Sequence, residues 1–254
     1  MNGLARIMEL RGSSFIKALL KYEQRRFNKM FMKQSVFEEI NVDFGIFPPV
    51  NVYPVYFSGN VQKPKNKLVI IGINPGYEKH ANRAEQAYLK KAGLYHGYCH
   101  IYGDFFKKRH RGLLPFFANL VGFLKRLYGA DQVFGTWDWL QDNVITLELI
   151  PFHSANAAGI RINNTDKYIE RYFKIIEKIL DHIKPPSPVI VNGFPGFARY
   201  FAEEKFAKHI SFKKANGFWI GQIAGKHNFI GLPFLIRVKG GKKQLVNKVR
   251  RYLK

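Results

Sequence analysis

The sequence has 254 residues, of which 46% are hydrophobic and 15% are aromatic. These fractions exclude an intrinsically disordered chain and are typical of a folded domain with a full core. Lysine and arginine number 41 against 18 acidic residues, and this formal net charge of +23 predicts a polyanionic partner, favouring nucleic acid over a merely solubilising surface.

Cysteine usage fits a reducing compartment, and hydropathy indicates a chain without a membrane span. Cys99 is the single cysteine, so the sequence has neither a disulfide framework nor a thiolate zinc site. Arg6, Glu9, Arg11 and Lys17 interrupt the first apolar runs, so we expect no signal peptide. No apolar stretch reaches the roughly 20 residues of a membrane helix. We therefore expect a cytoplasmic monomer without a membrane partner.

The first part of the chain reads as a basic helical extension. Residues 1–40 place apolar positions such as Ile16 and Leu20 among many basic ones, and a proline-rich connector follows. Lys21 and Arg25 either contact phosphates or form the solvated face of a helix packed on the domain. We predict an extension with its connector over residues 1–55 and an α/β domain over residues 56–254.

A buried strand is predicted at residues 68–71, which form a short apolar run rich in β-branched residues. The run breaks at Gly72-Ile73-Asn74-Pro75-Gly76, where glycine and proline end the strand. In an open α/β sheet, ligands bind beyond the carboxyl ends of the strands. Asn74, a polar side chain in a rigid turn at that point, is therefore a candidate site residue.

Residues 78–94 have helical spacing, and residues 95–111 then mix aromatic, histidine and basic residues with glycines. That mixture suits base stacking and phosphate contact on a flexible loop. The alternative is a structural loop pinned by its aromatic side chains. His96, His100 and His110 lack the carboxylate or cysteine neighbours of a convincing metal site, so we expect no metal and no cofactor.

A second strand runs from residue 143 into a Pro-Phe-His-Ser turn, after an apolar helix at residues 113–127. Glu148 lies inside this apolar strand, where a carboxylate is costly unless something pairs with it. It is either a partnered structural residue or a substrate-facing one. His153 and Ser154 follow the strand and are expected at the same edge as Asn74, with His153 facing the cleft.

The second half of the chain repeats the strand, turn and helix pattern. A helix at residues 165–184 precedes a strand at residues 189–191, which turns at Asn192-Gly193 into a helix at residues 197–209. Strands at residues 218–220 and 228–235 and a basic amphipathic helix at residues 240–254 complete the chain. This alternation predicts a three-layer α/β/α fold with a central, mostly parallel sheet.

Gly72-Ile73-Asn74-Pro75-Gly76 after a buried strand resembles motif A of the uracil-DNA glycosylase superfamily, and most closely its mismatch-specific uracil/thymine branch. The order of the later strands matches as well, and the resemblance covers residues 67–237. It implies that Asn74 positions the water that attacks C1′ of a flipped nucleotide. Gly76 matches the place where the uracil-specific branch has a tyrosine that excludes the thymine methyl, which implies a permissive pocket.

The resemblance implies a base-reading segment that begins at Glu148, and a catalytic pair of Asn74 with His153. The residues expected to line the base pocket are Gly72, Ile73, Pro75, Gly76, Tyr77, Glu148, Phe152, Ser154 and Asn192. The basic residues expected to contact the nucleic-acid backbone are Lys107, Lys108, Arg109, Arg111 and Arg237.

The chain departs from the family at the second catalytic loop. The family has His-Pro-Ser or Asn-Pro-Ser after the last strand, whereas this chain has Gly231-Leu232-Pro233-Phe234. His227 and Asn228 lie at the wrong end of that strand, so His153 either takes over the electrostatic role or activity is altered or lost.

Three functions remain open from the sequence. The first is a DNA glycosylase that hydrolyses the N-glycosidic bond of a deaminated or damaged base, in double-stranded or single-stranded DNA. The second is a non-catalytic nucleic-acid-binding protein of the same fold. The third is an unrelated α/β enzyme acting on a small nucleotide.

Overall fold

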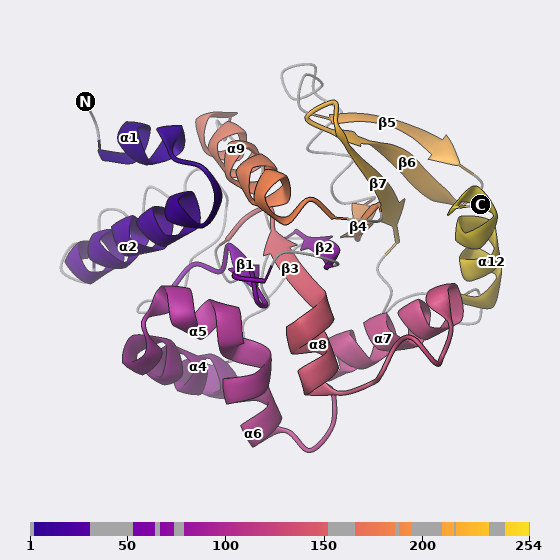
Figure 1. The fold of residues 1–254 in the computed structure, drawn as a ribbon, viewed down its shortest axis with the longest axis horizontal. Helices are drawn as coiled ribbons and strands as arrows, with labels where there is room; N and C mark the ends of the chain where they lie inside the picture. The colour runs from indigo at the N-terminus through magenta and orange to yellow at the C-terminus, as the bar shows by residue number, and fades with distance from the viewer. Residues whose placement is uncertain are drawn as a thin grey trace.

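The computed structural model describes residues 3–30, 53–63, 67–73, 79–151, 166–185, 188–194, 210–215, 217–233 and 242–253. Within these ranges the chain is an α/β protein built on a seven-stranded sheet, as the sequence predicted (Figure 1). The division of its helices into two covering layers stays a prediction.

The sheet has the strand order β1-β3-β2-β4-β7-β6-β5. Its strands are β1 (Phe57–Ser58), β2 (Leu68–Gly72), β3 (Val144–Glu148), β4 (Val189–Asn192), β5 (Ile210–Ala215), β6 (Phe218–Ile223) and β7 (His227–Leu232). The four neighbours β3, β2, β4 and β7 are parallel to one another. β1 pairs antiparallel with β3, and β5, β6 and β7 form an antiparallel run. The sheet is therefore mixed, with a parallel centre.

The parallel strands are buried because apolar side chains occupy both of their faces. Val69, Ile70 and Ile71 of β2 are each at most 2% exposed, and Ile145 and Leu147 of β3 are fully buried. The apolar run of β2 therefore forms the two-sided buried strand that its composition indicated.

The helices are α1 (Gly3–Glu9), α2 (Gly12–Met30), α4 (Lys79–Ala92), α5 (Leu94–His100), the π-helix η1 (Ile101–Phe106), α6 (Lys107–Arg109), α7 (Pro115–Tyr128), α8 (Trp137–Asn143), α9 (Asp166–Ile183) and α12 (Lys242–Leu253). Predicted helices are confirmed at α4, α7, α9 and α12. The helix predicted at residues 197–209 lies outside the described residues.

The N-terminal helix α2 packs on α5 and α9. Phe15, Ile16 and Leu19 are at most 1% exposed and belong to the same hydrophobic core as the sheet. Lys21 and Arg25 are exposed. This arrangement matches the second reading of the extension, a helix packed on the domain with a solvated basic face.

The flexible loop predicted at residues 95–111 is wrong, because residues 95–109 are helical and several aromatic side chains of this segment pack into the core. Tyr98 and Tyr102 are fully buried, and the Tyr98 hydroxyl donates a hydrogen bond of 2.9 Å to the Pro54 carbonyl. The rings of Phe106 and Trp137 stack with centroids 5.3 Å apart. These aromatic residues form core contacts, so they are not a surface for stacking bases.

The antiparallel half of the sheet contains a glycine that no other residue can replace without movement. A Cβ on Gly221 of β6 would overlap the Ser211 carbonyl oxygen and approach Phe212 Cα to 2.8 Å. Gly221→Ala should therefore lower the free energy of unfolding by about 1–3 kcal/mol, measured by urea denaturation. Gly122→Ala is the control, because nothing lies near its Cβ position in α7, and this change should raise stability by up to about 1 kcal/mol. If the Gly221→Ala protein were as stable as the wild type, the close packing described around Gly221 would be wrong.

Candidate functional site

The carboxyl ends of the parallel strands bring together three of the predicted pocket residues. Gly72 of β2 lies in register with Glu148 of β3, and Asn192 of β4 with Leu232 of β7. Main-chain pairing continues past the strands, with Ile150 N donating to Ile73 O at 2.8 Å. Gly72, Glu148 and Asn192 therefore lie along one edge of the sheet, which is the edge where ligands bind in open α/β folds.

Glu148 is the chemically distinctive residue at this edge. Its carboxyl group stands against Gly72, where a Cβ would overlap Oε2 and approach Cδ to 3.1 Å. The residue as a whole is partly exposed, but Oε2 is enclosed and has no hydrogen-bond partner. Glycine at position 72 thus makes room for a carboxyl group that the protein itself leaves unsatisfied.

The burial of Glu148 determines the protonation state of its carboxyl group. Desolvation raises the pKa of its carboxyl group to about 8, from the ordinary 4.5. At neutral pH the group is therefore mainly a neutral acid, with one O–H donor and one carbonyl acceptor. Oε2 of this neutral acid has no hydrogen-bond partner where it stands against Gly72, at the edge of the sheet.

A tyrosine from the π-helix covers the same face of β3. The Tyr102 hydroxyl and Thr146 Oγ1 are 2.9 Å apart, and Thr146 precedes Glu148 by two residues, so both side chains project from one face. Burial raises the pKa of Tyr102, and the nearby Glu148 raises it further. Tyr102 and Thr146 were missed in the sequence. The polar Thr146 inside an apolar strand, two residues before Glu148, was the available signal.

A second buried carboxyl group lies on α4. Glu85 is 9% exposed, and burial raises its pKa to about 7. It acts electrostatically on Tyr98, one helical turn before Tyr102. The pKa of Glu85 is therefore raised like that of Glu148, but Glu85 acts on a different tyrosine.

The other predicted pocket residues divide into two groups. Ile73 is 6% and Asn192 is 5% exposed, and Asn192 already has a partner within the chain. The remaining predicted residues lie outside the described part of the chain: Asn74, Pro75, Gly76, Tyr77, Phe152, His153, Ser154 and Arg237.

The basic cluster predicted to contact the nucleic-acid backbone is exposed and lies toward the amino end of β3, whereas Glu148 is at its carboxyl end. Lys107 pairs with Asp138 at 2.7 Å, and the Arg109 guanidinium lies 5.4 Å from the centre of the Phe105 ring. Lys108 and Arg111 are also exposed. Asp138 is in the first turn of α8, and α8 leads into the amino end of β3. In Figure 1 the β3 arrowhead points away from α8 and α6. The structure therefore gathers these cations with one another, away from the carboxyl edge.

The histidines of α5 lie close together. The rings of His96 and His100 have centroids 4.4 Å apart, and His96 Nε2 is 3.7 Å from Asp104 Oδ2. Across the described ranges, no group of three His, Cys, Asp or Glu side chains has the arrangement of a metal site. Cys99 is buried, and this burial raises the pKa of its thiol to about 11.

In the part of the chain that the structure describes, no helix has the length and apolarity needed to cross a bilayer. Comparisons of the chain with protein-family models, with curated proteins and with solved structures give no match, so its function is inferred from its own residues and geometry.

Proposed function

We propose that this protein is a DNA base-excision hydrolase whose site lies at the carboxyl edge of β2, β3 and β4. The observation that carries the proposal is Glu148, whose enclosed Oε2 has no hydrogen-bond partner at that edge. The parallel order β3-β2-β4-β7 supports it, because the carboxyl end of β2, which precedes Asn74 in the sequence, lies beside the carboxyl end of β3.

Glu148 reads the edge of an extruded base in this proposal. A neutral carboxylic acid offers one donor and one acceptor side by side. Uracil and hypoxanthine each present an N–H next to a carbonyl oxygen, which is the complementary pair. Enzymes that act on a base take it out of the stack and read its hydrogen-bonding edge in this way.

The reaction itself follows from the resemblance of residues 72–76 to motif A. Asn74 orients a water molecule, whose oxygen bonds to C1′ of the sugar. The C1′–N bond breaks, its electron pair leaves with the base, and the proton released from the water neutralises that base. An amide orients water but is a poor general base, so the reaction depends on a good leaving group.

The purified protein is tested on duplexes that each contain one uracil, hypoxanthine, xanthine or mismatched thymine. We expect release of at least one base, with uracil and hypoxanthine favoured over thymine. The free base is measured by chromatography, and an undamaged duplex is the control. No release from any duplex would reject the hydrolase.

A non-catalytic nucleic-acid-binding protein of the same fold is the second candidate. It is favoured by one observation, the absence of His and Ser from Gly231-Leu232-Pro233-Phe234 at the end of β7. In that case Glu148 selects a base without cleaving its bond, and the protein should bind damaged duplexes more tightly than undamaged ones.

A further inference from the structure

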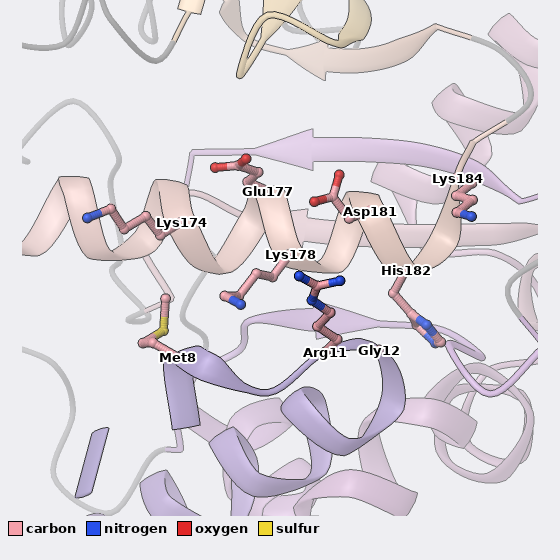
Figure 2. Close-up of a pocket in the computed structure, with 9 residues that line it drawn as sticks. All are labelled: Met8, Arg11, Gly12, Lys174, Glu177, Lys178, Asp181, His182 and Lys184. Atoms are coloured by element: carbon pink, nitrogen blue, oxygen red, sulfur yellow. The ribbon is translucent and has the colours of Figure 1, made fainter. Parts of the chain in front are cut away.

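A groove of about 840 Å³ runs between α9 and the junction of α1 with α2. Figure 2 shows its lining residues, which come from residues 8–12 on one side and from residues 174–184 on the other. Its Lys and Arg residues are Arg11, Lys174, Lys178 and Lys184, and its acidic residues are Glu177 and Asp181.

The two acidic residues already pair with Lys226, in the turn between β6 and β7, and with His227 at the start of β7. Lys226 Nζ lies 3.1 Å from Glu177 and 2.9 Å from Asp181, and His227 Nε2 lies 2.8 Å from Asp181. Burial alone would raise the pKa of Asp181, but the hydrogen bonds from Lys226 and His227 lower it. Asp181 is therefore ionised and committed to these partners.

Two of the cations, Arg11 and Lys178, lie on the other side of α9. In Figure 2 the carboxylates of Glu177 and Asp181 project to one side of the helix, while Arg11 and Lys178 lie on the side of the α1–α2 junction. Lys178 is held in place, because its Nζ donates to Leu10 O at 3.0 Å and lies 5.1 Å from the centre of the Phe15 ring. An ammonium has three N–H donors, so donors remain for a ligand.

The spacing of the cations indicates the shape of the ligand. Lys174 and Lys178 are one helical turn apart, and Lys184 follows the end of α9, so the row extends over roughly 15 Å at 1.5 Å per residue. One strand of DNA carries a phosphate about every 3.4 Å of duplex axis, and the phosphates are further apart along the winding strand itself, so a row of this length reaches more than one phosphate. A single phosphate would need cations that converge on one point, which this row does not provide.

We propose that this groove binds the phosphate backbone of a nucleic-acid strand. The groove is separate from the Glu148 site, because Asp181 pairs with the residues that begin β7 and Lys184 precedes β4, both at the amino edge of the sheet. Only the choice of DNA as the nucleic acid rests on the proposed function.

The test measures binding of a fluorescent 20-base-pair duplex without damaged bases, by anisotropy at several salt concentrations. Arg11→Ala/Lys174→Ala should weaken binding about tenfold at physiological salt. It should also reduce the slope of log K against log salt by about 1.8, since each lost phosphate contact removes about 0.9. Both altered side chains are exposed, so the fold should persist, and circular dichroism checks this.

Lys125→Ala/Lys243→Ala is the matched control, because it removes the same charge from the basic cleft between α7 and α12. It should change affinity less than threefold. If both double variants weakened duplex binding equally, the proposal would be overturned, since net charge alone would then explain binding. Tight binding of pyrophosphate, or of phosphatidylserine vesicles in place of DNA, would overturn it as well. Because the duplex carries no damaged base, a failure of excision leaves this result intact.

Discussion

Asn74→Ala should lower the single-turnover rate of base release by about 100- to 1,000-fold, the usual loss when one positioned polar group is removed from a transition state. The proposal gives Asn74 one task, holding the water that attacks C1′. Alanine cannot hold that water, but it leaves the base-reading edge and the basic surfaces unchanged. Binding of a damaged duplex should therefore stay within about threefold, because the lost interaction forms mainly in the transition state.

The control for this experiment is Asn228→Ala. Asn228 lies near the start of β7, where its side chain accepts a hydrogen bond of 3.1 Å from Gln222 Nε2. β7 is parallel to β4, so Asn228 is at the amino edge, as the sequence predicted for it and His227. Its loss should leave excision unchanged. If Asn74→Ala released base at the unaltered rate, Asn74 would not be the water-holding residue.

The parallel centre of the sheet was predictable because each of its strands is buried on both faces. Residues 68–71 and 189–191 are short apolar runs bounded by turn residues, a pattern that depends little on distant parts of the chain. β5 was missed for the opposite reason. Its residues 211–214 are all exposed, and they become a strand only through pairing with β6.

The segment at residues 95–111 shows how a glycine can mislead. Gly97 and Gly103 suggested a flexible loop, yet a Cβ on Gly97 would approach Leu89 Cδ2 to 2.6 Å. Gly97 therefore permits close packing of α5 on α4. Tyr98, Tyr102 and Phe106 follow one another at intervals of four residues, which is helical spacing, but the mixed composition of the segment obscured this signal.

At the site, the sequence identified Glu148 because a carboxylate inside an apolar strand has a high desolvation cost. It left open whether a partner stands nearby, since that depends on strands and helices far apart in the chain. The register of β2 with β3 answers this by placing Gly72 opposite Glu148. The approach of Tyr102 depends on how η1 packs on β3, which no local pattern records.

Glu148→Gln should remove the pH dependence of excision on the alkaline side. Above pH 8 the wild-type carboxyl group ionises and loses its donor, so the rate of uracil release should fall about tenfold per pH unit. Glutamine keeps a donor and an acceptor at every pH. The variant should therefore be active at pH 7 and should show no such decline between pH 7 and 9.5, measured in single turnovers.

The same carboxyl group ties stability to pH in a known direction. Its pKa is higher in the folded than in the unfolded chain, so between pH 4.5 and about 8 the native state holds a proton that the unfolded state has released. The free energy of unfolding should fall by about 1.4 kcal/mol per pH unit in this window from Glu148 alone. Glu148→Gln should remove that slope.

Glu85→Gln tests whether the alkaline decline of excision comes from base reading by Glu148 or would follow from any buried carboxyl group. Burial raises the pKa of Glu85 to about 7, so this variant should also flatten the decline of stability, in its case between pH 4.5 and 7. Glu85 acts on Tyr98 rather than at the Gly72 edge, so the alkaline decline of excision should persist in Glu85→Gln.

If wild-type excision instead rose with pH, the ionised carboxylate of Glu148 would be the active form. Glu148 would then act as a base rather than as a donor to the extruded nucleobase.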